Sequence, residues 1–305
     1  MRRWKDRFAG RLFFITTLLP IGLLVAMIVG LAIRVQPLAA SQPIGDLLFG
    51  QIWLPSEGRF GFWPFIMSTL WVTVVAMIIA VPACLLSALY LSEYAGLRLR
   101  ALMKPLLDIL AAIPSVVYGV WGLLVIVPFT ANVAAPLAQK LLGFIPLFRS
   151  NNTTGYSVFS AGLVLAVMVT PVIVAVTYEV LQTVPQGLRE ASLAMGATMW
   201  QTIKFTLWPK ALPGIIAAIV LGFSRAFGET IAVMMVVGNV TQTPTSIFDP
   251  AYPLPALIAN NYGEMMSIPM YDSALLGAAL ILLLVVLGFN LIAMLALRQA
   301  VRRAV

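Results

Sequence analysis

The stretch VPQGLREASLAMGATMWQTIKFTLWPKALPGI, from Val184 to Ile215, interrupts long apolar sequence with an amphipathic helical pattern. Pro185 stands near the first position of a helix, where its missing N–H group costs nothing. The apolar residues at helical spacing after it are Leu188, Ala191 and Met195. Gly196 is expected to end this first helix.

A second short helix is predicted directly after the first. Thr198 and Gln201 have the spacing of a capping box, in which each side chain bonds the other residue's backbone. The helix then runs through Trp200 and Ile203 before Pro209 leads into the next apolar segment. The whole stretch therefore predicts a compact helix–turn–helix.

Two uses of this helix pair remain open from its residues alone. Leu188, Met195 and Trp200 could serve as apolar anchors in a groove on another protein. The same side chains could instead rest on lipid, as in interfacial helices.

The rest of the composition places this helix pair in a membrane protein. The 305 residues are 61% hydrophobic and 10% charged, which is too apolar for a soluble domain. The chain has no His, and Cys84 is its single cysteine, so a disulfide framework or a His/Cys metal site cannot form within it. No phosphate-binding loop of the Walker A type occurs, so any ATP that drives this protein must bind another chain.

Six apolar segments are long enough to cross about 30 Å of hydrocarbon as helices. Their predicted ranges are Leu12–Ile33, Trp63–Leu91, Pro105–Phe129, Val158–Leu181, Ala211–Val237 and Ala274–Leu297. The first follows a basic segment but is longer than the apolar core of a secretory signal, so we expect it to remain as an anchor. Lys104 and Asp108, four residues apart, could pair near the start of the third segment.

The basic residues predict the orientation. Five Lys and Arg precede the first span, and three lie in each of the second-to-third loop, the fourth-to-fifth loop and the C-terminal tail, fourteen altogether. Four lie on the other side and Arg225 lies within a span, which accounts for all 19. Because basic loops stay in the cytoplasm, both termini are expected there, and the net charge of +8 needs no nucleic acid to explain it.

Three longer loops are expected on the outer side. They are Gln36–Phe62, Thr130–Ser157 and Gly238–Ser273. They could form a docking face for an external partner or serve only as connections.

The stretch GFSRAFGET, Gly222–Thr230, places Arg225 and Glu229 four residues apart in the fifth predicted span. On one continuous helix the two side chains would share a face. The small residues on that face are Ala218, Gly222 and Ala232. Two interpretations remain: a buried ion pair that fixes helix packing, or an anion pathway, since a guanidinium suits phosphate oxygens and a carboxylate tempers its charge.

Glu229 carries a second hypothesis. Phosphate near neutral pH keeps a proton that a carboxylate can accept as a hydrogen bond, whereas ionised sulfate has none. Glu229 would then help to reject sulfate.

The helix pair resembles the EAA loop of bacterial ABC importer permeases. The matching residues are Glu190, Ala191, Gly196 and Pro209, while Ser192, Thr206 and Trp208 depart from the pattern. The resemblance implies that this loop, residues 185–210, holds the helix that couples the permease to an ATP-binding subunit. The coupling residues implied are Leu188, Glu190, Ala191, Met195, Gly196 and Trp200.

Three further motifs narrow the resemblance. AAIPSVVYG at Ala111–Gly119, RAFGET at Arg225–Thr230 and the following Gly238-Asn239 are similar to the phosphate-importer permeases. The long first outer loop is typical of the PstC-type subunit, and the likeness covers roughly 63–298.

This resemblance implies an all-α membrane protein with six transmembrane helices and the type I ABC importer permease fold, in the bacterial inner membrane. It would comprise an N-terminal segment over 1–62, a permease core over 63–298 and a basic tail over 299–305. The chain would move phosphate by alternating access and would not itself be an enzyme.

The resemblance also implies partners. They are a PstA-type permease, two ATP-binding subunits that hold ATP and Mg²⁺, and an external phosphate-binding protein. The alternatives are a permease for sulfate or molybdate and a membrane protein that transports nothing. An intramembrane enzyme is disfavoured, because the chain has no His and no paired carboxylates within a span.

Overall fold

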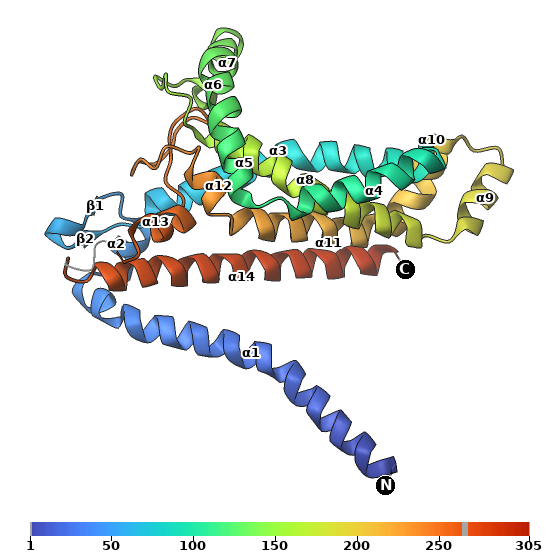
Figure 1. Cartoon of the computed structure of the whole chain (residues 1–305), viewed down its shortest axis with the longest axis horizontal. Helices are drawn as coiled ribbons and strands as arrows, with labels where there is room; N and C mark the ends of the chain where they lie inside the picture. The colour runs from blue at the N-terminus through green and yellow to red at the C-terminus, as the bar shows by residue number, and fades with distance from the viewer. Residues whose placement is uncertain (1, 264–267, 305) are drawn as a thin grey trace.

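The computed structural model describes residues 2–263 and 268–304, and most of this part of the chain is helical (Figure 1). Within these residues, six helices are long and apolar enough to cross a membrane, which confirms the predicted all-α class and the number of spans. Their ranges are Ala9–Ser41, Trp63–Tyr94, Ser115–Leu142, Val158–Thr183, Met199–Phe227 and Tyr271–Leu295.

The centre of the molecule is the pair formed by α3 (Trp63–Leu89) and α8 (Val158–Thr183), which pack along each other. Gly162 of α8 lets the two backbones approach, because a Cβ atom there would lie 2.6 Å from Cγ1 of Val75. α11 (Trp208–Phe227) packs on α8, and α14 (Tyr271–Ala304) packs on α11.

The first helix, α1 (Arg2–Ser41), begins away from the body of the molecule and packs on α14 with its C-terminal part (Figure 1). Most of its apolar side chains are exposed, Phe13 to 67%. This surface suits lipid or a neighbouring subunit.

The third predicted span, Pro105–Phe129, is wrong at both ends. Residues 97–112 form a separate helix, α4 (Leu97–Ala112), which packs on α8. The chain turns at Pro114, which lacks an N–H group and keeps Ile113 extended. The Tyr118 hydroxyl donates a 2.8 Å hydrogen bond to the Leu110 carbonyl, which ties the two sides of the break together. Pro114 therefore ends one helix and begins another.

After this break the chain forms one long rod that rises from the bundle (Figure 1). Its α-helical and π-helical pieces are α5 (Ser115–Trp121), η3 (Gly122–Ile126), α6 (Val127–Phe129), η4 (Thr130–Ala134) and α7 (Ala135–Leu142). The predicted outer loop over 130–157 is thus helical as far as Leu142.

The fifth predicted span, Ala211–Val237, is also wrong, because α11 ends at Phe227. A one-turn helix, α12 (Ile231–Met234), follows. The carbonyls of Val236 and Val237 then accept hydrogen bonds from the backbone N–H groups of Ser157 and Ala251, outside any helix.

The motif at Gly238-Asn239 forms the turn that follows. Gly238 has φ +100° and Asn239 has φ +53°, in a left-handed region that these two residue types tolerate best.

The first outer loop is folded around aromatic side chains. It contains α2 (Ile44–Phe49), the turn η1 (Pro55–Glu57) and a hairpin of β1 (Trp53–Leu54) and β2 (Arg59–Phe60), with Trp53 opposite Phe60. The Trp53 ring lies 4.9 Å from Phe65 and 6.0 Å from Tyr271, measured between centroids. These contacts fasten the hairpin to α3 and α14. The remaining outer elements are η5 (Pro146–Phe148) and α13 (Leu254–Asn261).

The predicted helix pair lies at the opposite end of the molecule (Figure 1). It consists of α9 (Gln186–Ala194) and α10 (Met199–Thr202), followed by the π-helical turn η6 (Ile203–Leu207); a similar turn, η2 (Tyr90–Tyr94), ends α3. The start of α1 and the end of α14 point toward this same end. The predicted tail over 299–305 continues α14 to Ala304, and Val305 lies outside the described residues.

Candidate functional site

The turn between α9 and α10 is closed by a glycine in the left-handed conformation. Gly196 has φ +85°. Its N–H donates to the Leu193 carbonyl at 2.9 Å, and the Ala197 N–H donates to the Ser192 carbonyl at 3.2 Å. These are the two bonds of a Schellman motif. The prediction that Gly196 ends the first helix is confirmed.

The second helix begins with the predicted capping box. The Gln201 N–H donates to the Thr198 hydroxyl at 3.3 Å, and the Thr198 N–H donates to the Gln201 side-chain oxygen at 2.8 Å. The hydroxyls of Ser192 and Thr202 are 2.9 Å apart and link α9 to α10. The pair is therefore a rigid unit built from local hydrogen bonds.

Large apolar side chains of this unit are exposed. Leu188 is exposed to 38%, Trp200 to 59% and Met195 to 84%. Glu190 and Ala191 are exposed on α9 as well, and Glu190 accepts a hydrogen bond from Gln186 at 2.9 Å. We call the surface formed by Leu188, Met195 and Trp200 the coupling face. An apolar surface on a projecting helix pair suits a protein groove.

Arg225 lies near the end of α11, at membrane depth. Its neighbour Ser224 donates a 2.9 Å hydrogen bond to Asn290, which belongs to the apolar span of α14. The Arg225 side chain is exposed on this chain. Among the described residues, no hydrogen bond or ion pair engages its guanidinium.

Glu229 lies beyond the end of α11, so the expectation that it shares a helical face with Arg225 is wrong. The helix stops at Phe227 and Gly228 follows it, which breaks the spacing of one helical turn. The Glu229 carboxylate accepts a 3.3 Å hydrogen bond from the Ala232 N–H at the start of α12. It borders a small cavity together with Thr69, Thr73, Phe227, Pro253 and Pro255. The two charged groups do not form an ion pair in this conformation.

The small residues of α11 serve packing against α8. Ala218 is fully buried, and a Cβ atom on Gly222 would lie 2.5 Å from the Ile173 side chain. The small size of Ala218 and Gly222 therefore lets α8 approach α11 closely. Arg225, three residues after Gly222, is exposed.

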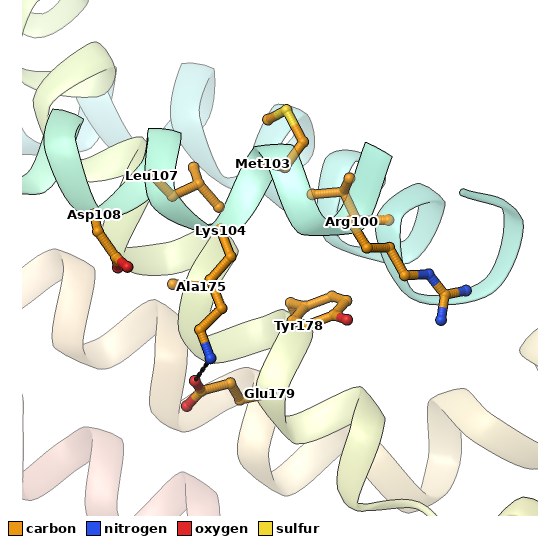
Figure 2. A pocket seen from close by; sticks show the side chains of 9 residues that line it. Arg100, Met103, Lys104, Leu107, Asp108, Ala175, Tyr178 and Glu179 are labelled. Atoms are coloured by element: carbon orange, nitrogen blue, oxygen red, sulfur yellow. Dashed lines mark ion pairs between the residues drawn. The ribbon is translucent and has the colours of Figure 1, made fainter. Parts of the chain in front are cut away.

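A pocket lies between α4 and α8, at the end of the molecule that carries the helix pair (Figure 2). Lys104 reaches across it and contacts Glu179, with 3.8 Å between Nζ and Oε1, and does not pair with Asp108. Both side chains are about 70% exposed, at 71% and 67%. Exposed ion pairs of this kind contribute about 0 to 1 kcal/mol to stability.

The family of binding-protein-dependent transport system inner membrane components matches residues 80–305. The chain belongs to this family. Its relatives include a probable ABC transporter permease, YqgH, of Bacillus subtilis, 37% identical over 79% of this chain and 73% of the relative. The phosphate transport system permease PstC of Haemophilus influenzae is 35% identical over 79% and 77%. The probable PstC of Methanocaldococcus jannaschii is 33% identical over 81% and 79%.

Solved importer structures share the permease fold. An inward-facing MetNI methionine ABC transporter chain superposes with a TM-score of 0.54 at 21% identity, covering 78% of this chain and 97% of that one. A bacterial alginate ABC importer chain gives a TM-score of 0.59 at 17% identity, covering 98% and 99%. The predicted type I ABC importer permease fold is confirmed, and the protein is an inner-membrane permease.

Two features of this permease were not singled out from its sequence. Tyr118, inside one of the quoted motifs, bridges the break at Pro114. Arg189 forms an ion pair with Glu93, which is 96 residues away. The sequence offered only one sign of this pair, which is that each of the two opposite charges lies near the end of an apolar segment.

Gly196→Ala is expected to weaken the attachment of an ATP-binding subunit about fivefold, since a left-handed residue with a Cβ atom costs about 1 kcal/mol. No atom lies within 4 Å of the added Cβ, so the effect is conformational. Gly187→Ala is the matched control, because Gly187 also has open space but lies within α9 at negative φ. Binding can be measured by titrating the ATP-binding subunit onto the purified permease. Equal affinities of the two variants for the ATP-binding subunit would show that the conformation of this turn does not affect its binding.

Proposed function

We propose that this permease carries inorganic phosphate into the cytoplasm as one membrane subunit of an ATP-driven importer. Its PstC relatives, at 33% to 37% identity over about four fifths of the chain, support phosphate as the substrate. The observation that carries the proposal is Arg225, a cation at membrane depth with no hydrogen-bonding or ion-pair partner among the described residues.

An exposed arginine at this depth requires a polar environment. Facing lipid, it would cost about 2.5 to 3.5 kcal/mol or more. A second permease of the PstA type, placed against this face, would remove the cost and would leave the guanidinium beside a shared pathway. There its planar donors would bind phosphate oxygens.

The break after Phe227 supports a pathway at this position. Non-helical backbone at membrane depth is tolerated where it lines a cavity or is covered by protein. Gly228 and Glu229 lie in this break, and Glu229 borders a cavity. The Glu229 carboxylate would accept a hydrogen bond from the proton that phosphate retains. Ionised sulfate has no such proton, so this bond would distinguish the two anions.

The remaining assignments complete the importer. The fourteen basic residues on one side support a cytoplasmic location for both termini and the helix pair. Two ATP-binding subunits would bind ATP and Mg²⁺ there, one on the coupling face of this chain, so the permease itself would catalyse nothing. An external phosphate-binding protein would dock on the outer loops. Residues 1–62 would form the anchor and outer hairpin, 63–298 the transport core, and 299–305 the tail.

Reconstitution tests this proposal. The permease would be assembled in vesicles with a PstA-type permease, two ATP-binding subunits and a phosphate-binding protein. We expect ATP-dependent accumulation of radiolabelled phosphate, which unlabelled phosphate suppresses and sulfate or molybdate does not. Accumulation of sulfate or molybdate would identify a different oxyanion permease, and no ATP-dependent accumulation of any of them would indicate a membrane scaffold.

A further inference from the structure

A buried ion pair joins the coupling loop to the second span. Arg189 of α9 donates two hydrogen bonds of 3.1 Å to the Glu93 carboxylate, one from Nε and one from Nη2. The Arg189 side chain is 16% exposed and the Glu93 side chain only 3%. A two-pronged contact of this kind fixes both the distance and the angle between its partners. It thereby sets the orientation of α9 relative to η2.

The same guanidinium also holds the end of α8. Its Nη1 donates to the Val184 carbonyl at 2.6 Å, and its Nη2 donates to the Leu181 carbonyl at 2.7 Å. These carbonyls lie at the C-terminus of the helix, where a helix leaves acceptors unsatisfied and favours a cation. One side chain of α9 therefore contacts the cytoplasmic ends of both central helices.

Further hydrogen bonds extend this cluster to α4. The Ser92 hydroxyl donates to Glu93 at 2.7 Å and accepts from Gln182 at 3.0 Å. Arg100 of α4 donates to the Ser92 carbonyl at 2.5 Å. We call Ser92, Glu93, Arg100, Gln182 and Arg189 the joint. The ends of α3, α4, α8 and α9 meet in it.

The two sides of α9 make different contacts. Leu188 belongs to the exposed coupling face, whereas its neighbour Arg189 points inward to the joint. A force applied to the coupling face reaches the spans along the chain, since α10 continues through η6 into α11, and through contacts such as these. We infer that the Arg189–Glu93 pair is the positioning contact that makes α9, α3 and α8 move as one body when an attached ATP-binding subunit moves. This inference rests on the proposed transport function and deepens it.

A pair that only stabilises the fold would behave differently. Replacing both members of a buried ion pair by apolar residues often preserves stability, because the cost of burying charge disappears. The variant Arg189→Met/Glu93→Met can therefore restore packing without restoring the fixed geometry. Arg189→Lys keeps the charge, but a single ammonium group cannot donate to two carboxylate oxygens and two carbonyls at once as the planar guanidinium does.

The first measurement is the amount of phosphate moved per ATP hydrolysed by the reconstituted complex. We expect this ratio to fall at least about fivefold in Arg189→Lys and in the double Met variant, with the ATP-binding subunits still attached. The matched control is Lys104→Met/Glu179→Gln, which removes the exposed ion pair of Figure 2 at the same end of the molecule. The control should keep the wild-type ratio.

The second measurement does not depend on which anion is carried. Spin labels on Gln186→Cys in α9 and Tyr94→Cys in η2 report the distance between the two elements, and the buried Cys84 would not take a label. In the wild-type background, addition of ATP should leave this distance unchanged, and in Arg189→Lys it should change.

Several outcomes would overturn the inference. They are a distance that shifts with ATP in the wild-type background, a wild-type transport ratio in Arg189→Lys or in the double Met variant, and failure of Arg189→Lys to assemble. The last result would make the pair a folding element. A wild-type complex that moves no phosphate would refute the proposed function alone, because the spin-label result is read independently of the anion.

Discussion

Arg225→Gln is expected to reduce ATP-driven phosphate uptake by about 100-fold in the assembled complex. A hydrogen bond to a charged group contributes about 1.5 to 3 kcal/mol, and each 1.4 kcal/mol corresponds to about tenfold. The glutamine cannot supply the paired donors of a guanidinium or its charge. Because no hydrogen bond or ion pair involves the Arg225 side chain within the described residues, the fold should tolerate the change. Uptake of radiolabelled phosphate into vesicles, normalised to assembled complex, measures the effect.

Two variants separate the role of Arg225 from a general loss of charge. Arg98→Gln removes the same charge from an exposed position on α4 and should leave uptake within about twofold of wild type, as surface substitutions usually do. Arg225→Lys keeps the charge without the planar fork, so its uptake should lie between those of wild type and Arg225→Gln. Normal phosphate uptake by an assembled Arg225→Gln complex would show that Arg225 does not bind phosphate along the pathway.

Trp200→Ala is expected to weaken binding of the ATP-binding subunit about 30-fold. A large aromatic anchor at the centre of an interface contributes about 2 kcal/mol or more when truncated. Trp200 is 59% exposed at the start of α10, which the capping box holds rigid. The permease and the ATP-binding subunit can be titrated in detergent, with affinity as the readout.

The control for this variant is Phe144→Ala. Phe144 is an 80% exposed aromatic residue beyond the end of α7, away from the helix pair. Its loss should leave the affinity unchanged. If both variants bind the ATP-binding subunit like the wild type, the coupling face is not the docking surface, and the alternative of a helix pair resting on lipid gains support.

Local chemistry made the helix pair predictable. The bonds of its turn and of its capping box join residues at most five apart, as between Ser192 and Ala197, and the contact between Ser192 and Thr202 spans ten residues. A glycine that adopts positive φ and a capping box are both visible in the residues themselves. The number of spans was predictable for a similar reason, because the length of an apolar segment is a property of the sequence.

The interruptions of the third and fifth spans were harder to predict because tertiary contacts decide them. Hydropathy continues past Phe227, but α11 ends there, and the carbonyls of Val236 and Val237 accept hydrogen bonds from Ser157 and Ala251 outside any helix. The supposed helical neighbours Arg225 and Glu229 were separated for this reason. Similarly, no local rule pairs Arg189 with Glu93, since their contact depends on where α3 and α9 end.

The most direct test of the phosphate pathway is protection of a cysteine placed between its two charged groups. Gly228 is exposed, has negative φ, and would place a Cβ atom 3.9 Å from its nearest neighbour, so Gly228→Cys leaves Arg225 and Glu229 in place. In the assembled complex, the rate of thiol modification by a methanethiosulfonate reagent would be measured with phosphate or sulfate. Phosphate at ten times its half-saturating concentration should slow modification about tenfold, and sulfate should not. Modification at the same rate with and without phosphate would contradict a phosphate route past Arg225.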